Sequence, residues 1–222
     1  MSCWDSDFVF ALRRSPVAWV SALVVLILVM SALFAPLVAP LNPFDMAALN
    51  LMNGFTPPMT PNAFTGEVFI LGTDDQGRDL YSAILYGLRV SLFVGFSAVG
   101  LAMTLGVFLG LLAGYSGGWV DTLIMRSADV QVTFPSILIA MLIYGVSQGL
   151  IPPESRGDLA IGVLILSIGL SEWVQFARTV RGTTLVEKEK EYVQAAKLMG
   201  LNPLVVMVRH ILPNITTPVL VI

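Results

Sequence analysis

The sequence predicts an all-α membrane protein whose chain crosses a bilayer several times. The first observation is composition: 56% of the 222 residues are hydrophobic and only 12% are charged, whereas a soluble domain carries about 25% charged residues. So little polar surface would not cover a water-facing globule. The second observation is that uncharged stretches recur along nearly the whole chain. Since a helix needs about 20 apolar residues to cross the hydrocarbon core, we expect a polytopic transmembrane helical bundle.

Several segments are long enough to cross a bilayer, and the last of them contains a single acid, Glu172. They are residues 17–39, 90–120, 130–153 and 159–177. A further apolar run follows Pro213 and reaches Ile222 after about nine residues, which is about half of a crossing. We therefore expect four full spans plus a partial fifth, in a sequence that is a fragment or a truncated product.

The first span has an alternative interpretation as a secretory signal peptide. Arg13 and Arg14 supply a positive flank, and adjacent arginines also occur in twin-arginine signals. The apolar run is longer than the usual 7–15 residues of a signal peptide. Pro40 after the candidate cleavage point at Ala39 also suits a peptidase poorly. We therefore favour an uncleaved transmembrane anchor over residues 17–39.

The orientation of the spans follows from the positions of lysine and arginine, which are enriched in cytoplasmic loops. This rule predicts a cytoplasmic N-terminus at 1–16, a periplasmic connector at 40–88, an outer turn near 149–158 and a cytoplasmic loop at 178–213. With this topology the inner side receives Arg13, Arg14, Arg126, Arg178, Arg181, Lys188, Lys190, Lys197 and Arg209, and the outer side receives Arg78, Arg89 and Arg156.

Two features of the spans concern helix packing. Small residues recur at intervals of four along one face of the second span: Ala98, Ala102, Gly106, Gly110 and Gly114. Small side chains let a second helix approach closely, so we interpret this row as a packing face, although glycine is also simply frequent in membrane helices. In the third span, Phe134-Pro135 is expected to kink or interrupt the helix, because proline lacks an amide donor.

The outer connector is predicted to be irregular and to lead into a short helix. Residues 40–66 are rich in proline, which interrupts regular structure. Thr73 and Gln76 have the spacing of a capping box, which would begin a helix. The residues that follow place an apolar stripe on that helix, formed by Leu80, Ala83, Ile84 and Gly87.

The sequence predicts no catalytic residues, no metal site and no cofactor. The lone cysteine, Cys3, excludes an internal disulfide, and the lone histidine, His210, excludes a histidine-rich metal site. The acidic cluster at residues 74–79 lacks the spaced oxygen ligands of a calcium loop. Glu172 lies near the inner end of its span, where we favour an interfacial position over a role in ion coupling. No basic tract with interleaved aromatics suggests nucleic-acid binding.

The cytoplasmic loop is predicted to form a helix–turn–helix. Its first helix has an apolar face at positions i, i+3, i+4 and i+7, formed by Tyr192, Ala195, Ala196 and Met199. Gly200 is placed to end this helix, Asn202 to cap a second, and Pro203 to occupy the first position of the second.

The second helix of the loop has its own apolar side and is expected to close at Pro213. That side is formed by Leu204, Val205, Val208, Ile211 and Leu212. Together the two helices would make a compact unit on the cytoplasmic face. The small side chains of Ala195 and Ala196 would let a groove of another protein close around it, so the loop suits docking.

The same loop resembles the EAA loop of ABC importer permeases, whose pattern reads E-A-A-x3-G-x9-I-x-L-P. The spacing matches throughout, while Gln194 replaces the glutamate and His210 replaces the isoleucine. Docking geometry is therefore implied, but a salt bridge from the glutamate is not. The matching residues are Gln194, Ala195, Ala196, Gly200, His210, Leu212 and Pro213.

Two further stretches are similar to the dipeptide/oligopeptide/nickel group of these permeases. Residues 71–79 match its L-G-T-D-x-x-G-R-D segment, and residues 114–121 resemble its cytoplasmic turn before the third span. An N-terminal span followed by a proline-rich connector is similar to the C-type subunit. The resemblance implies the fold of an ABC type I importer permease, with residues 89–222 as an incomplete permease domain.

The resemblance implies a machine with several partners embedded in a lipid bilayer. They are a second, different permease subunit, two ABC ATPase subunits and a periplasmic solute-binding protein, in the cell inner membrane. ATP hydrolysis would occur on the separate ATPase chains, since this sequence lacks G-x-x-x-x-G-K-[S/T]. This chain would be a non-catalytic, multi-pass subunit that needs no cofactor and binds no nucleic acid.

Several alternatives for the function stay open from the sequence. The substrate could be a dipeptide, an oligopeptide, nickel or another small solute, because the spans contain nothing that separates them. An ion-driven secondary transporter would favour intramembrane acids or an inverted repeat, and only Glu172 qualifies. An intramembrane enzyme would need a convergent set of nucleophile and base or metal ligands.

Overall fold

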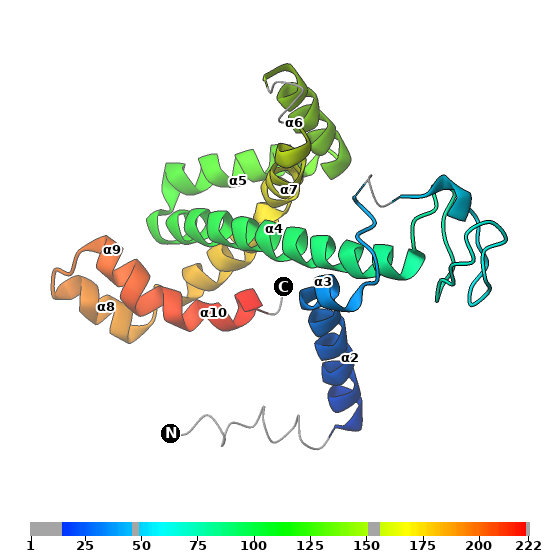
Figure 1. Cartoon of the computed structure of the whole chain (residues 1–222). Helices are drawn as coiled ribbons and strands as arrows, with labels where there is room; N and C mark the ends of the chain where they lie inside the picture. Colours follow the sequence, from blue (N-terminus) through cyan, green and yellow to red (C-terminus); the bar gives the residue numbers. More distant parts are fainter. Residues whose placement is uncertain (1–14, 46–48, 151–155, 221–222) are drawn as a thin grey trace. The chain divides into compact units, whose positions relative to one another are not determined.

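A computed structural model describes residues 15–45, 49–150 and 156–220, which are mostly helical (Figure 1). The chain divides into two compact units, Met1–Phe93 and Val94–Ile222, and each is considered by itself. Most of the predicted cytoplasmic segment 1–16, with Cys3, Arg13 and Arg14, lies outside the described residues. So does the middle of the outer turn predicted at 149–158.

The first unit begins with helix α2, Pro16–Leu33. Ser15 caps it by accepting a hydrogen bond from the amide of Ala18, and Pro16 occupies the first turn, where its missing amide costs nothing. Most side chains of α2 are exposed, as suits a helix surrounded by lipid. The helix ends at Phe34, and α3, Ala35–Val38, follows with a proline in its first turn. The predicted anchor is therefore a long helix and one further turn.

The connector of the first unit is irregular, apart from the 3₁₀ turn η2, Leu51–Asn53, and two isolated bridges. Its interior is polar: Asn53, Thr56, Asn62 and Thr73 are buried. The amide of Thr56 donates to Thr73 Oγ1 at 2.8 Å, and Asn62 Nδ2 donates to Thr56 Oγ1 at 2.6 Å. Hydrogen bonds between side chains and backbone thus replace secondary structure in holding this segment together.

Helix α4, Leu80–Ser116, joins the connector to the second unit. Asp79 caps it, because its Oδ2 accepts from the amide of Ser82 at 3.0 Å. The capping box predicted at Thr73 is wrong: the Thr73 hydroxyl donates to Asn53 O and serves the connector instead. The predicted short helix is also wrong, since the helix that begins at Leu80 continues through the second span. At about 1.5 Å per residue its length exceeds the thickness of the hydrocarbon core.

A glycine pair ends α4 and begins the next helix. Gly117 and Gly118 have φ values of +66° and +55°, which side chains with a Cβ rarely adopt. Helix α5, Gly118–Val132, starts directly after this turn. The second span therefore ends at Ser116 and not at Val120 as predicted.

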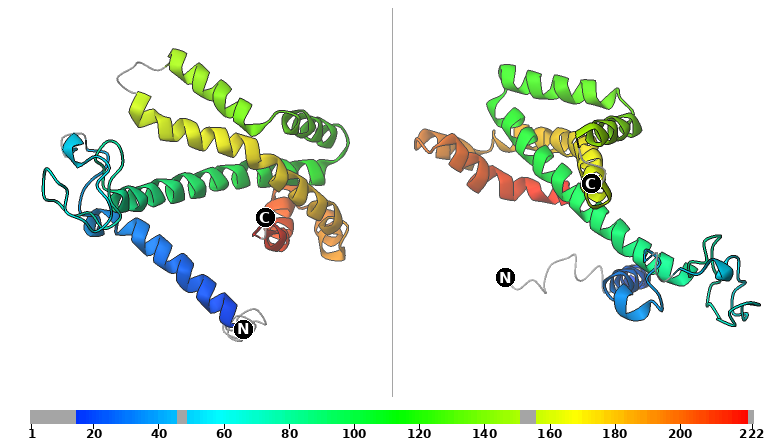
Figure 2. Two further views of the ribbon diagram at one scale, coloured as in Figure 1. Left: turned by 90° about the vertical axis from the view of Figure 1, so that its right-hand side faces the viewer. Right: turned by 45° about the horizontal axis from the view of Figure 1, so that its top comes forward.

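The third predicted span is broken as expected at Phe134-Pro135. Helix α5 stops at Val132, α6 covers Ser136–Leu150, and the two are bent by 91°. Proline cannot donate to a preceding carbonyl, and the residue before it avoids the helical region. Helix α7, Arg156–Glu187, then lies beside α6 (Figure 2).

The row of small residues on α4 faces α7. A Cβ added at Gly106 would lie 2.6 Å from Trp173 O, and one added at Gly114 would lie 2.7 Å from Thr184 Cβ. Ala98 and Ala102 are also buried. Because partners on α7 advance in step with positions on α4, the two helices run in the same direction and end on the same side.

The remaining helices of the second unit follow α7. They are α8, Glu191–Leu198, α9, Pro203–Val205, the π-helical stretch η4, Val206–Ile211, and α10, Leu212–Leu220. Among the described residues, α2, α4 and α7 from Ala160 onward are long and apolar enough to cross a membrane. The bent α5–α6 pair makes a fourth span if it is counted as one. The all-α class is confirmed, and α10 lies in the apolar run where the sequence predicts the beginning of a further span.

Candidate functional site

The segment between α7 and α10 folds as the helix–turn–helix that the sequence predicts. Gly200 has φ +72° and ends α8, with the amide of Leu201 donating to Ala196 O at 3.2 Å. This is the Schellman pattern, which satisfies carbonyls that the helix end leaves free. The side chain of Asn202 accepts from the amide of Leu204, and Pro203 occupies the first turn of α9.

The second helix of this segment does not close at Pro213, which corrects the prediction. α9, η4 and α10 follow without a break from Pro203 to Leu220. In η4 each amide bonds to the carbonyl five residues earlier, and not four as in an α-helix. The amide of Leu212, for example, donates to Met207 O. A π-helical turn widens the helix just before the proline, and π-bulges commonly accompany such irregularities. The helix can therefore continue past a residue that has no amide hydrogen.

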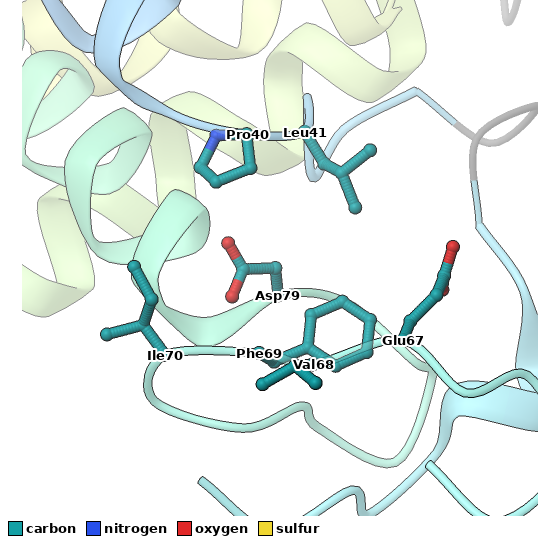
Figure 3. A pocket seen from close by; sticks show the side chains of 7 residues that line it. All are labelled: Pro40, Leu41, Glu67, Val68, Phe69, Ile70 and Asp79. Atoms are coloured by element: carbon teal, nitrogen blue, oxygen red, sulfur yellow. The ribbon is translucent and has the colours of Figure 1, made fainter. Parts of the chain in front are cut away.

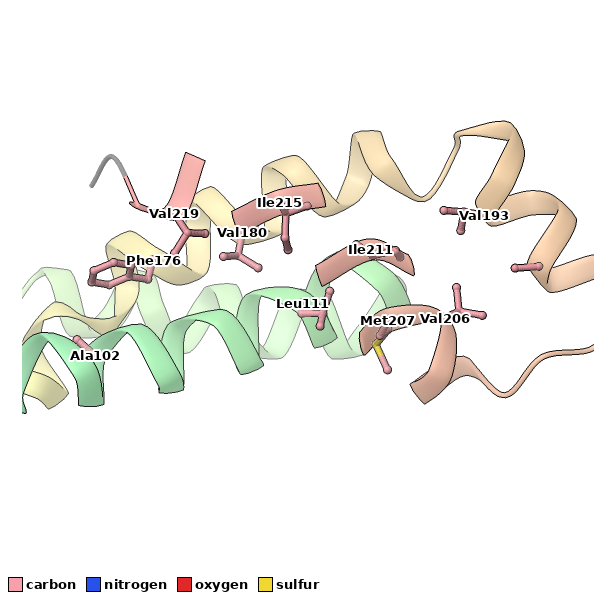
Figure 4. Close-up of a cluster of buried hydrophobic side chains, with 11 residues drawn as sticks. Ala102, Leu111, Phe176, Val180, Val193, Val206, Met207, Ile211, Ile215 and Val219 are labelled. Carbon is pink, nitrogen blue, oxygen red and sulfur yellow. The ribbon is translucent and has the colours of Figure 1, made fainter. Parts of the chain in front are cut away.

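A hydrophobic core joins the segment to α4, α7 and α10 (Figure 4). Val193 and Ala196 of α8 meet the buried residues Val206, Met207 and Ile211 of η4. The same cluster continues through Leu111 of α4, Val180 of α7 and Ile215 of α10. A displacement of α8 is therefore opposed by side chains from all three helices, since interiors are close-packed.

The buried face of α8 is not the face that the sequence predicts. Of Tyr192, Ala195, Ala196 and Met199, Ala196 alone is buried, while Val193 packs beside it. Both faces carry apolar residues at helical spacing, so periodicity did not distinguish them. Contact with η4 decides which side is covered.

The other apolar side chains of the segment form an exposed surface, which we name the apolar patch. Leu198 is 89% exposed, Met199 72%, Leu204 64% and Val208 57%. Leu201 and Val205 are exposed to a smaller degree. An apolar cluster at the tip of a helical hairpin is typical of a surface that another protein covers. The prediction included part of this patch but missed Leu198, which stands beside the glycine that ends α8.

The residues of the EAA-like pattern divide between core and surface. Ala196 is buried, Leu212 packs partly against the core, and Ala195, Gly200 and Pro213 are exposed. Gln194 Nε2 donates to Lys188 O at 3.0 Å, just after the end of α7. His210 is half-buried, and its carbonyl accepts from Asn214 Nδ2 at 2.7 Å.

Two lysines attach the segment to the end of α4. Lys188 Nζ donates to Gly114 O at 3.0 Å, and Lys197 Nζ lies 5.5 Å from the ring centre of Tyr115. Positive charge near the C-terminal carbonyls of a helix is favourable because of the helix dipole. The C-terminal ends of α4 and α7 therefore lie next to each other, in contact with the segment.

An ion pair and a hydrogen bond between α5 and α7 were missed by sequence reasoning. Arg181 holds the carboxylate of Asp121 with two nitrogens, one contact being 2.6 Å. Trp173 Nε1 donates to Gln131 Oε1 at 2.6 Å near the break in the third span. These partners are far apart in the chain, so no local spacing could have indicated them.

Two pockets lined by described residues do not single out a substrate site. In the first unit, a pocket of about 300 Å³ is lined by Pro40, Leu41, Glu67, Val68, Phe69, Ile70 and Asp79 (Figure 3). Asp79 already caps α4, and Glu67 accepts from Asn53 Nδ2 at 2.5 Å. In the second unit, an apolar groove of about 350 Å³ lies between α6 and α7. Glu172 is exposed and accepts from Gln175 at 3.2 Å.

Comparison with known families matches two parts of the chain. Residues 106–222, more than half of the chain, match the binding-protein-dependent transport system inner membrane component. Residues 2–58 match the N-terminal TM domain of oligopeptide transport permease C. The first match contains α7, the helix–turn–helix and α10, and the second contains α2.

Individual relatives agree with both matches. A dipeptide transport system permease protein of Alkalihalophilus pseudofirmus is 36% identical over 100% of this chain and 66% of its own length. One from Haemophilus influenzae is 32% identical over 97% of this chain and 68% of its own. A glutathione transport system permease protein of Pectobacterium atrosepticum is 36% identical over 94% of this chain. The chain spans about two thirds of the length of these relatives. It belongs to the family of binding-protein-dependent transport system inner membrane components.

Proposed function

We propose that the chain is a transmembrane permease subunit of an ATP-binding-cassette importer for short peptides or similar small solutes. Family membership supports a role in binding-protein-dependent transport. Relatives named for dipeptide, oligopeptide and glutathione transport support peptides as the substrate class. The chain itself hydrolyses no ATP in this proposal.

The observation that carries the proposal is the apolar patch together with its attachment. Leu198 and Leu204 present large apolar surfaces to the outside of the helix–turn–helix. Val193 and Ile211 belong to the core that joins the same segment to α4, α7 and α10. An ATPase that holds the patch would move α4, α7 and α10 through this core. The segment would therefore transmit the closure of ATPase domains to the spans.

The proposal assigns partners and orientation. One of two ATPase subunits would dock at residues 178–213 from the cytoplasm, and a second permease subunit would complete the pathway in the inner membrane. A solute-binding protein would deliver substrate to the periplasmic side, where the connector at residues 40–88 lies. The basic residues near the end of α7, including Arg181, Lys188 and Lys190, support a cytoplasmic position for the docking segment. The same topology places the N-terminus inside.

Placing charges in the apolar patch tests the docking role. The double substitution Leu198→Asp and Leu204→Asp should weaken binding of the ATPase subunit about 30-fold or more, because apolar contacts at the centre of an interface contribute about 1 kcal/mol or more each. Both side chains are exposed, so folding should be unaffected. Binding would be measured by titrating labelled ATPase onto the permease complex in nanodiscs.

The matched control is Leu51→Asp, which changes an equally exposed leucine in the connector. It should leave ATPase binding unchanged. Equal binding by the patch variant and the control would contradict the docking role.

A further inference from the structure

We propose that the hydroxyl of Tyr192 positions α8 relative to α7 and α10, so that the helix–turn–helix moves as one body with these two helices. The consequence of this arrangement for transport rests on the function proposed above. The positions of the three helices around the hydroxyl are independent of that function.

The first contact of the hydroxyl is with the end of α7. Tyr192 Oη donates to Glu187 Oε1, and Lys190 Nζ lies 2.8 Å from the other oxygen of that carboxylate. The side chain of Glu187 is only 9% exposed. A hydrogen bond to an ionised acceptor is shorter and about twice as strong as one between neutral groups. Each oxygen of Glu187 thus has a donor from the region where α8 begins.

The second contact of the hydroxyl is with α10. Asn214 Nδ2 donates to Tyr192 Oη at 3.0 Å and to His210 O at 2.7 Å. One oxygen atom therefore connects the last residue of α7, the first turn of α8 and the first turn of α10. We refer to Glu187, Tyr192 and Asn214 as the clasp.

The clasp supplies a constraint that the hydrophobic core does not. Apolar contacts such as those between α8 and η4 resist separation but have no directional preference. Hydrogen bonds depend strongly on angle, so they fix the rotation of α8 about its axis. That rotation determines whether Leu198 and Met199, the part of the apolar patch at the end of α8, face outward.

The hydroxyl remains a donor over the physiological pH range. Partial burial of the hydroxyl, and then the Glu187 carboxylate, raise the pKa of Tyr192 to about 12. Loss of the proton would place two negative charges side by side, which is why Glu187 opposes it. The clasp therefore acts as a permanent link rather than as a pH switch.

Removing only the hydroxyl tests the clasp in the purified full chain. Tyr192→Phe keeps the ring, so the core should persist. Backbone amides of residues 191–198 and 206–214 should both exchange about tenfold faster with deuterium, because a hydrogen bond to a charged group is lost. Tyr144→Phe, at an exposed tyrosine of α6, should leave both segments unchanged.

Substitutions of Glu187 separate positioning from simple packing. Glu187→Gln keeps an acceptor for Tyr192 and should retain most of the protection, whereas Glu187→Ala should reproduce the effect of Tyr192→Phe. Unchanged exchange in Tyr192→Phe, or a change in residues 191–198 alone, would overturn the clasp.

The transport consequence is read in a reconstituted importer. Tyr192→Phe should leave the KM for ATP unchanged, while solute taken up per ATP hydrolysed falls severalfold. Normal coupling together with faster exchange would show that the clasp does not transmit motion. Failure of the docking test at Leu198 and Leu204 would contradict the proposed function without changing the exchange result.

Discussion

Gly110→Leu is expected to have the largest effect on folding of any single substitution considered for this chain. A Cβ at this position would lie 2.5 Å from Ala177 O and 2.9 Å from Val180 Cβ. Both atoms belong to backbone or to the base of a side chain, so neither can rotate away. Overpacking typically costs about 1–3 kcal/mol, and a leucine that must displace a helix should reach or exceed the upper value. Unfolding of the purified chain by SDS, followed by tryptophan fluorescence, measures the loss.

Gly100→Leu is the matched control on the same helix. Among the described residues, no atom of another element lies within 4 Å of the Cβ position at Gly100. Since leucine favours a helix by close to 1 kcal/mol over glycine, this variant should be as stable as the original chain or slightly more stable. Equal destabilisation by the two substitutions would show that α4 and α7 do not pack through the glycine row.

Arg181→Met is expected to destabilise the second unit by about 2–3 kcal/mol. Asp121 has a side chain that is only 16% exposed, and Arg181 holds it with two nitrogens. Removing the arginine leaves a poorly solvated carboxylate without its partner, and breaking a buried pair costs about 3–5 kcal/mol. We expect less because the pair is only partly buried. The same SDS titration would detect the change.

The double substitution Asp121→Asn and Arg181→Met tests whether the isolated charge causes the loss. The double variant should recover at least half of the unfolding free energy that Arg181→Met loses, since neutral partners leave no uncompensated carboxylate. Arg178→Met is a second control: its pair with Asp129 is 48% and 54% exposed, and such pairs contribute about 0–1 kcal/mol. A loss from Arg178→Met as large as that from Arg181→Met would refute the argument.

Local signals predicted the secondary structure of the helix–turn–helix well. Gly200, Asn202 and Pro203 each act within a few residues of their own position, so the turn between α8 and α9 follows from the sequence. The break at Pro135 follows for the same reason. The prediction that the helix ends at Pro213 was wrong, because η4 changes the hydrogen-bond register just before the proline. No spacing of residues in the sequence predicts a π-helical turn.

The sequence alone could not decide which apolar side chains of this segment are buried. Val193 and Leu198 are both apolar residues of α8, yet one is buried and the other is almost fully exposed. The difference depends on where η4 and α7 lie beside α8, and these positions are set by the folded chain and not by the residues next to α8 in the sequence. The clasp around Tyr192 has the same origin, since Asn214 reaches it from the other side of the hairpin.

The sequence by itself determined the membrane-spanning, all-α character of this protein and the pattern that its family shares. Both depend on composition and on spacing along the chain, which need no knowledge of neighbours. Only the tertiary structure decided which helices the glycine row joins, which carboxylate Arg181 neutralises and which face of α8 is exposed. These depend on contacts between residues that are distant in sequence, where small differences in packing select one arrangement among several with equal periodicity.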